Sequence, residues 1–170
     1  MQSKTVRRIA IRITIVAIPL GVLWASMAYL HLLKYDRYSK NRALLGVEFS
    51  AINYWRDTGH PPTSVEELIN AGYITNCIHE YTGDEYASFW PGERSSARWE
   101  HVKPIVLDFP SEVENCVLKD HRLVDQTTGI AYDLVRLPGW ETPPEIKDQL
   151  AKKWLEAARQ DSSEEEEGMQ

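Results

Sequence analysis

The sequence contains none of the short motifs that identify common catalytic or nucleotide-binding sites. It has no P-loop, no dinucleotide-binding glycine fingerprint, and no H-E-x-x-H pattern among its five histidines. Its serine, histidine and aspartate residues are scattered without a nucleophile elbow. We therefore predict that the chain is not an enzyme, and we assign no cofactor and no metal ion to it.

Cysteine is scarce, since Cys77 and Cys116 are the only two in the chain. Neither falls in a C-x-x-C or metal-ligand spacing. An even pair in an exported domain can form one disulfide, and the alternative is two buried thiols that never meet. On a strand, Cys77 and His79 would share a face, which leaves half of a metal site or a Cys/His pair as a further alternative.

Acidic residues are absent before Lys34, where the chain carries four basic ones: Lys4, Arg7, Arg8 and Arg12. The remainder has 15 of the 19 basic residues and all 25 acidic ones. A domain this acidic repels phosphate backbones, so we predict no nucleic-acid partner. The run of glutamates at residues 164–167 predicts a solvated, disordered tail over residues 161–170.

Residues 13–33 form an apolar run of 21 residues without Asp, Glu, Lys or Arg. About 20 helical residues span the hydrocarbon core of a bilayer, and Pro19 and Gly21 are compatible with a spanning helix. We interpret the run as an uncleaved signal anchor. A cleaved signal peptide is the alternative, because Ser26 and Ala28 are small residues at suitable spacing. A prepilin leader needs a preceding glycine and an early glutamate, and neither is present.

The residues after this run predict a second, amphipathic helical stretch. Residues 35–57 lack proline, contain one glycine (Gly46), and place apolar residues at helical intervals: Leu44, Leu45, Val47, Ala51, Ile52 and Trp55. We expect a helix that continues from the span, or restarts near Asp36, and packs one face on a sheet.

The segment "RDTGHPPTSVEELINAGYI" predicts a sharp junction after that helix. Gly59 can end the helix in the left-handed conformation, and Pro61-Pro62 prevent its resumption. Thr63 or Ser64 can cap a short helix, with Glu66 or Glu67 completing a capping box. Gly72 ends that helix, and an extended segment follows. These acids serve the cap, because a helix N-terminus favours negative charge.

The second half of the chain predicts short strands separated by turns, over residues 85–90, 104–109, 116–119, 122–124 and 130–135. The connections are too short for crossovers, so the fold class is α+β with a small antiparallel sheet. Tight turns are expected at Asp120-His121 and at residues 125–129.

Two further features are candidates for binding a partner protein. The last helix, from Glu145 to about Arg159, carries a narrow apolar stripe that includes Trp154; it either docks on its own domain or binds a partner from a flexible hinge. Residues 89–99 place aromatics around a polar loop, which either forms a recognition surface or closes the sheet. The candidate partner-binding residues are Phe89, Trp90, Arg94, Arg98, Trp99 and Trp154.

Taken together, an apolar N-terminal helix, the string "YWRDTGHPPTSVEELINAGYI" and a small sheet resemble the type II secretion pseudopilins, most closely the major, G-type branch. The matching positions are Asp57, Gly59, Pro62, Thr63, Glu66, Glu67, Leu68 and Gly72. "DQTTGIAYDL" resembles a later family turn through Asp125, Gly129 and Tyr132. The prepilin leader is missing, so the resemblance implies a pseudopilin-like domain on an ordinary anchor, without filament assembly.

We accordingly expect five segments: a basic cytoplasmic N-terminus (1–12), a transmembrane anchor (13–33), a pseudopilin-like domain (34–137), a hinge with a C-terminal amphipathic helix (138–160) and a disordered tail (161–170). Basic residues flank the span equally, whereas the cysteines favour an exported domain. The resemblance implies a single-pass protein of the bacterial inner membrane with a periplasmic domain. It would bind the lipid bilayer and another envelope protein. The alternatives are an envelope enzyme or metal-binding protein using Cys77 and His79, and an acidic immunity-type inhibitor.

Overall fold

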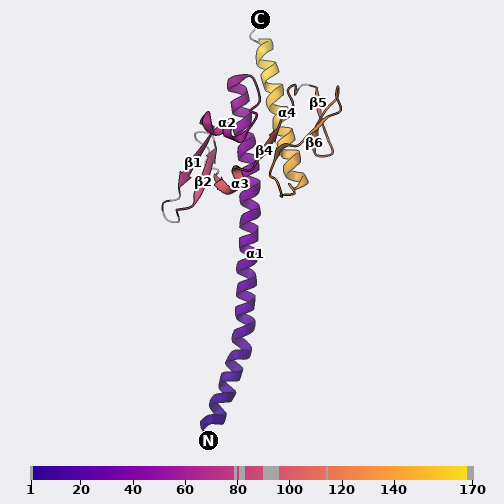
Figure 1. Cartoon of the computed structure of the whole chain (residues 1–170). Coiled ribbons are helices and arrows are strands. Elements are labelled where there is room, and N and C mark those ends of the chain that lie inside the picture. The colour runs from indigo at the N-terminus through magenta and orange to yellow at the C-terminus, as the bar shows by residue number, and fades with distance from the viewer. Residues whose placement is uncertain (1, 79, 81–82, 90–95, 114, 168–170) are drawn as a thin grey trace. The chain divides into compact units, whose positions relative to one another are not determined.

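The structure is a computed structural model that describes residues 2–78, 80, 83–89, 96–113 and 115–167, with side chains described from residue 18 to residue 159. The chain divides into two compact units, Met1–Tyr38 and Ser39–Gln170. The first unit consists of the N-terminal part of helix α1, which runs over Gln2–Thr58 (Figure 1). The second unit contains the rest of α1 and every other element.

The second unit is α+β, as the sequence predicted. After α1 come helix α2 and the strands of a first sheet: α2 Val65–Asn70, β1 Ile74–Ile78, β2 Glu85–Phe89 and β3 Ser96–Arg98. They are followed by α3 Trp99–Val102, β4 Val106–Asp108, β5 Cys116–Lys119, β6 Arg122–Asp125, β7 Ala131–Tyr132, β8 Leu134–Arg136 and α4 Pro144–Glu167. The apolar face of α1 and the stripe of α4 supply much of the core, including Leu44, Val47, Ala51, Leu150 and Trp154.

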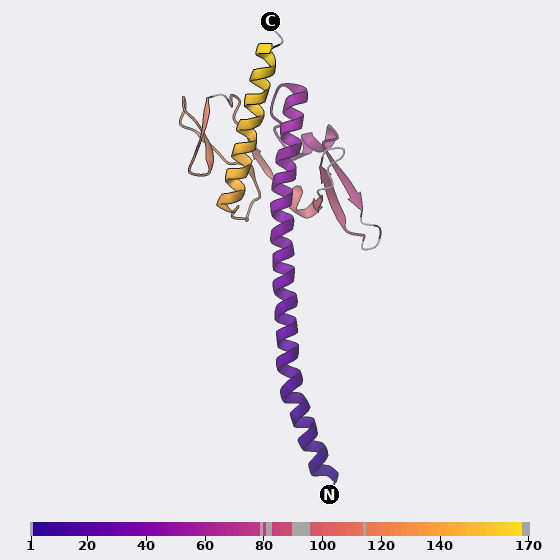
Figure 2. The same cartoon turned by 180° about the vertical axis from the view of Figure 1, so that it is seen from behind.

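The strands of the described residues form three small antiparallel sheets, where the sequence predicted one. Their orders are β1-β2-β3, β4-β8 and β5-β6-β7. Figures 1 and 2 show the first sheet with α2 and α3 on one side of the C-terminal part of α1, and α4 with the β5–β7 sheet on the other. A helix between two groups of strands separates them, so they do not join into one ladder. The antiparallel prediction is confirmed for every described pair.

The junction after α1 folds as its residues predicted. Gly59 has φ +76° and Gly72 has φ +85°, the left-handed conformation that favours glycine. Ser64 is the N-cap of α2, and its hydroxyl accepts the backbone N–H of Glu67 at 3.2 Å. The N–H of Tyr73 donates to Leu68 O at 2.9 Å, which closes the end of α2 with a six-residue capping turn.

Two buried serines join α1 to the first sheet. The hydroxyl of Ser39 accepts the backbone N–H of Arg98 at 3.2 Å, at the end of β3. The hydroxyl of Ser50 donates to the carbonyl of Tyr73 at 3.0 Å, beside the start of β1. Both serines are buried, so their hydrogen bonds satisfy groups that water does not reach.

The predicted strand over residues 130–135 is broken into β7 and β8. Leu134 has φ +54°, and the N–H of Val135 donates to Asp133 O at 2.7 Å, two residues back. This hydrogen bond and the positive φ define a tight γ-turn, which is a strained conformation for leucine. Burial of Leu134, 2% exposed, holds the residue in place. The predicted turn at Asp120-His121 is confirmed, with φ +48° and +64° between β5 and β6.

The C-terminal part differs from its predicted division. Helix α4 continues to Glu167, so the glutamate run is helical where we predicted a disordered tail. Glutamate is a good helix former, and a helix already nucleated upstream extends at small cost. The predicted hinge and last helix, residues 138–160, belong to the same compact unit as the strands. That unit begins at Ser39, close to the predicted boundary at residue 34.

The N-terminal unit presents apolar side chains to its surroundings. From Ile18 to Leu33 the large apolar residues of α1 are between 48% and 75% exposed. Within the part of the chain that the structure describes, no helix combines the length and the apolar character required to cross a bilayer.

Candidate functional site

Three of the predicted partner-binding aromatics are core residues. Phe89 and Trp154 are fully buried, and Trp99 is 7% exposed. Arg98 is partly exposed and forms an ion pair with Glu100 at 3.0 Å. Trp90 and Arg94 lie outside the described residues. We therefore remove Phe89, Trp99 and Trp154 from the candidate surface; the alternative that these aromatics close the domain describes them better.

Trp154 shows how α4 is held. Its ring stacks on Phe109 with centroids 4.3 Å apart, and on Trp55 of α1 at 5.2 Å. The apolar stripe of α4 therefore docks on its own domain. The alternative of a partner-binding helix on a flexible hinge is wrong for this face, because the side chain that would anchor a partner has no exposed surface.

The two cysteines lie on different sheets. Cys77 is exposed on β1, whereas Cys116 is buried on β5 and its Sγ lies 3.5 Å from Glu112 O. Both belong to the described residues, and no disulfide joins them. His79 lies outside the described residues. Among those described, no group of three His, Cys, Asp or Glu side chains is placed to hold a metal ion.

The junction acids are engaged in a local hydrogen-bond network. Tyr54 donates its hydroxyl to Glu67 Oε1 at 2.6 Å, and Thr63 donates both N–H and hydroxyl to Glu67 Oε2. The Tyr54 hydrogen bond, with those from Thr63, lowers the pKa of Glu67 to about 2. Tyr73 donates to Asp57, and this bond raises the pKa of Tyr73 to about 12. The network fixes the turn, and it confirms the capping role that the sequence predicted for Glu67.

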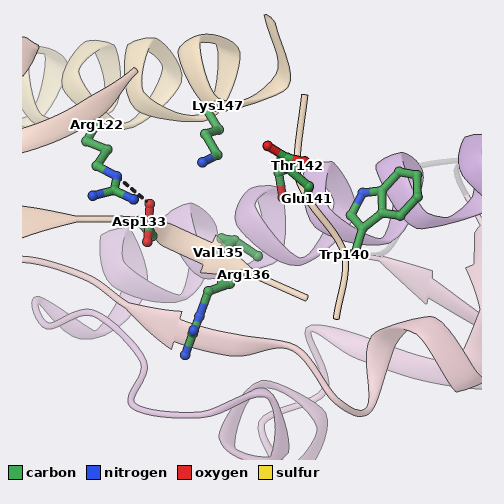
Figure 3. Close-up of a pocket in the computed structure, with 8 residues that line it drawn as sticks. All are labelled: Arg122, Asp133, Val135, Arg136, Trp140, Glu141, Thr142 and Lys147. Carbon is green, nitrogen blue, oxygen red and sulfur yellow. Dashed lines mark ion pairs between the residues drawn. The ribbon is translucent and has the colours of Figure 1, made fainter. Parts of the chain in front are cut away.

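A pocket of about 200 Å³ lies where β6 and β8 meet the start of α4 (Figure 3). It collects basic, acidic and aromatic side chains around the buried Val135, and its lining residues are Arg122, Asp133, Val135, Arg136, Trp140, Glu141, Thr142 and Lys147. The pocket is our candidate functional site, because it brings charged residues from three separate elements together.

Strand pairing places the first two charged residues. Leu123 pairs with Tyr132, so the antiparallel register sets Arg122 opposite Asp133. Their side chains form an ion pair, with Arg122 Nε 2.9 Å from Asp133 Oδ1. The γ-turn at Leu134 then redirects the chain, and Val135 continues into β8, which pairs with β4. The strained turn therefore positions both the acid and the apolar floor of the pocket.

The segment between β8 and α4 supplies the opposite wall. Trp140, Glu141 and Thr142 precede the proline pair that begins α4, and Lys147 follows within the first two turns of the helix. In Figure 3 the side chain of Lys147 extends from α4 toward Val135. Nearby, His121 Nδ1 lies 2.9 Å from Asp148 Oδ1, which ties the β5–β6 turn to the same helix.

Lys147 and Trp140 are two of the pocket residues whose donors have no partner among the residues that the structure describes. Lys147 forms no ion pair with any residue that the structure describes. Trp140 Nε1 is buried and donates to no described acceptor. The Trp140 ring is nevertheless fixed in place, because Lys40 Nζ lies 4.8 Å from its centroid in a cation–π contact. The site thus contains the fixed aromatic ring of Trp140 and two donors without an acceptor, the Lys147 ammonium group and the Trp140 indole N–H.

Sequence reasoning missed this site. It interpreted "LPGWETPP" as a hinge, and the basic residues of the pocket are distributed over residues 122–147 without a motif. The one available signal was a tryptophan inside a Gly/Pro-rich polar segment, an unusual place for a large aromatic side chain.

A second unusual group is the carboxylate of Glu48 on α1. It is fully buried, and neither oxygen has a hydrogen-bond partner among the described residues. Burial raises the pKa of Glu48 well above its usual value, and the charge of Lys153 on α4 opposes the shift only in part. Burial therefore favours the neutral form of Glu48 in the folded domain.

Comparisons with known proteins give no relative for this chain. No protein-family model matches it, and no curated protein and no solved structure is significantly similar to it.

Proposed function

We propose that this chain is a membrane-anchored protein-interaction module of the bacterial envelope. In this proposal residues 13–33 cross the inner membrane once, and a pseudopilin-like domain lies in the periplasm. The anchor holds the binding domain near the membrane surface, where the domain contacts another envelope protein.

The observation that carries the anchor is the apolar first unit. The run over residues 13–33 has no charged side chain, and its described large apolar residues are about half exposed or more. Exposed apolar surface on every side of a helix is unfavourable in water and favourable in lipid. Residues 13–17 complete the run in the sequence, giving about the 20 residues that a span requires.

The pseudopilin-like part of the proposal is supported by element order. A long helix ends at Thr58, a short capped helix follows the Pro61-Pro62 pair, and small antiparallel sheets come next. This order accords with the resemblance of residues 54–74. The interaction role is supported by the pocket, since arginine and tryptophan are enriched among residues that dominate protein interfaces.

Membrane fractionation of the full chain tests the anchor. We expect the wild-type chain to remain in the membrane fraction after a carbonate wash. The double variant Leu20→Arg/Leu23→Arg should lose this retention, because each arginine in the middle of a span costs about 2.5–3.5 kcal/mol. Asn70→Arg, at an exposed position on α2, is the matched control. Release of the wild-type chain by carbonate would contradict the anchor.

A topology reporter tests the location of the domain. It should be fused after Gln170, because a fusion after Arg159 would interrupt α4. A reporter that is active only in the periplasm should then be active. Zinc analysis of the same purified chain addresses the metal-binding alternative: one zinc per chain, lost in Cys77→Ser, would replace the interaction proposal.

A further inference from the structure

We infer that the pocket between β6, β8 and α4 binds the carboxylate of an acidic side chain on a partner protein. This inference rests on the interaction role proposed above, because the partner protein supplies the carboxylate. The pocket itself is defined by the contacts of the second unit alone.

The first reason is a cation without a counter-charge. Lys147 is half-buried, lines the pocket and has no ion-pair partner among the described residues. Glu141 lines the same pocket but is exposed and forms no described ion pair with it. A partly desolvated ammonium group attracts an anion more strongly than one in open water, because fewer water molecules compete for it.

The second reason is an unused hydrogen-bond donor. Trp140 Nε1 is buried without an acceptor among the described residues, and leaving a buried donor without a partner is unfavourable. In Figure 3 the nitrogen edge of the Trp140 ring faces Thr142, on the pocket side of the ring. The Lys40 contact holds this edge in position. An oxygen atom of a ligand would supply the missing acceptor.

The charge balance favours a carboxylate over phosphate. The lining contains three basic and two acidic side chains, and Arg122 is already paired with Asp133 at 2.9 Å. The net positive charge that remains is small, so it suits a single negative charge better than the two of phosphate near pH 7. The planar guanidinium of Arg122 keeps further donors for a carboxylate oxygen beyond its Nε.

The small volume of the pocket and its apolar floor favour a single side chain of a peptide over a larger ligand. The pocket volume is about 200 Å³, below the roughly 300–1,000 Å³ of typical sites for drug-sized ligands and cofactors. Val135 is buried at its floor and offers an apolar contact for the methylene groups of a glutamate. These features fit a glutamate or aspartate side chain presented by a protein surface.

The test uses the full chain in non-ionic detergent micelles, with its tryptophan indoles labelled with ¹⁵N. The probe is acetyl-tetraglutamate amide, titrated at constant ionic strength. The Trp140 indole resonance, assigned with Trp140→Phe, should shift and saturate. Inorganic phosphate at the same concentration should leave it unshifted. A shift with phosphate and none with the peptide would overturn the carboxylate assignment, as would no shift with either.

Variants on α4 distinguish binding in the pocket from a general electrostatic attraction of the peptide to the protein. Lys147→Gln should weaken peptide binding about tenfold or more, the usual effect of losing a charge-assisted hydrogen bond. Lys147→Arg should retain most of it. Lys152→Gln removes an exposed charge from the same helix outside this pocket and should leave binding unchanged. Equal weakening by Lys147→Gln and Lys152→Gln would overturn the inference.

The outcome is independent of the membrane experiment. A chain that fractionates as soluble would contradict the anchor and still allow the indole titration to succeed. A failed titration would remove the carboxylate site and leave the carbonate result unaffected. Urea unfolding of each Lys147 variant checks that the domain remains folded.

Discussion

The ring of Phe89 on β2 lies directly against the backbone of α1 at Gly46. A Cβ added at Gly46 would come within 2.3 Å of Phe89 Cδ2 and Cε2. Both residues are buried, so neither the helix nor the strand can move aside without opening the core. The one glycine in this part of α1 therefore allows the helix and the first sheet to approach each other.

Replacing this glycine should destabilise the domain. Alanine has the higher helix propensity by about 1 kcal/mol, yet overpacking a filled core costs about 1–3 kcal/mol. We expect Gly46→Ala to lower the urea midpoint, measured by circular dichroism. Gly21→Ala, on the same helix with no atom within 4 Å of the added Cβ, is the control. Equal or higher stability of Gly46→Ala would show that Phe89 can move aside.

The Glu67 network should make stability depend on acid pH. The pKa of Glu67 is lowered from 4.5 to about 2 in the folded state, chiefly by the Tyr54 hydrogen bond. A lowered pKa stabilises the fold above pH 4.5, and this contribution is lost as the pH falls from 4.5 toward 2. Glu67→Gln should remove this part of the pH dependence in urea unfolding, whereas the neighbouring Glu66→Gln should keep it.

Glu48 should change the pH dependence of stability in the direction opposite to that of Glu67. Burial raises its pKa, so the folded state binds a proton that the unfolded state loses above pH 4.5. The destabilisation of the folded state by Glu48 therefore grows as the pH rises above 4.5. Glu48→Leu should raise the free energy of unfolding by at least about 1 kcal/mol at pH 8, and by less at pH 5. A variant less stable than wild type at pH 8 would show that Glu48 has a partner in solution.

The stack around Trp154 predicts a large effect of truncation. Trp154→Ala removes a fully buried ring that contacts Trp55 and Phe109. Such truncations cost about 3–5 kcal/mol, so near-ultraviolet circular dichroism and the urea midpoint should both fall. Lys152→Ala, exposed on the same helix, should leave both unchanged. Unaltered stability of Trp154→Ala would restore the partner-binding interpretation of α4.

The two thiols should differ in reactivity. Cys77 is exposed and Cys116 is buried, so a maleimide should modify Cys77 within minutes and Cys116 only after denaturation. Mass spectrometry of the intact chain counts the adducts. Purification without reductant tests the disulfide alternative as well, because a chain with no reactive thiol under denaturing conditions would contradict the arrangement described.

The sequence was most informative where structure is local. The turn at Gly59, the Ser64 cap, the Gly72 terminus and the Asp120-His121 hairpin depend on neighbouring residues, so the sequence predicts each of them. The burial of Phe89 and Trp99 depends on α1, about 40 to 60 residues away in the chain. No periodicity within residues 89–99 distinguishes a buried aromatic from an exposed one.

The pocket could not be predicted for a similar reason. Arg122 and Asp133 meet through strand register, and Lys147 lines the same pocket only because α4 docks beside β6 and β8. The γ-turn at Leu134, which positions Asp133 and Val135, has no signal in a stretch that otherwise resembles one strand. Leucine is among the least expected residues for a positive φ.

The serine hydrogen bonds of α1 have a mechanical consequence. Ser39 binds Arg98 at the end of β3, and Ser50 binds Tyr73 just before β1, at points about 16 Å apart along the helix axis. A pull on α1 along its axis therefore loads both serine bonds at once, in shear. Because each bond carries part of the load, tension on the helix is transmitted to the sheet at two separate points.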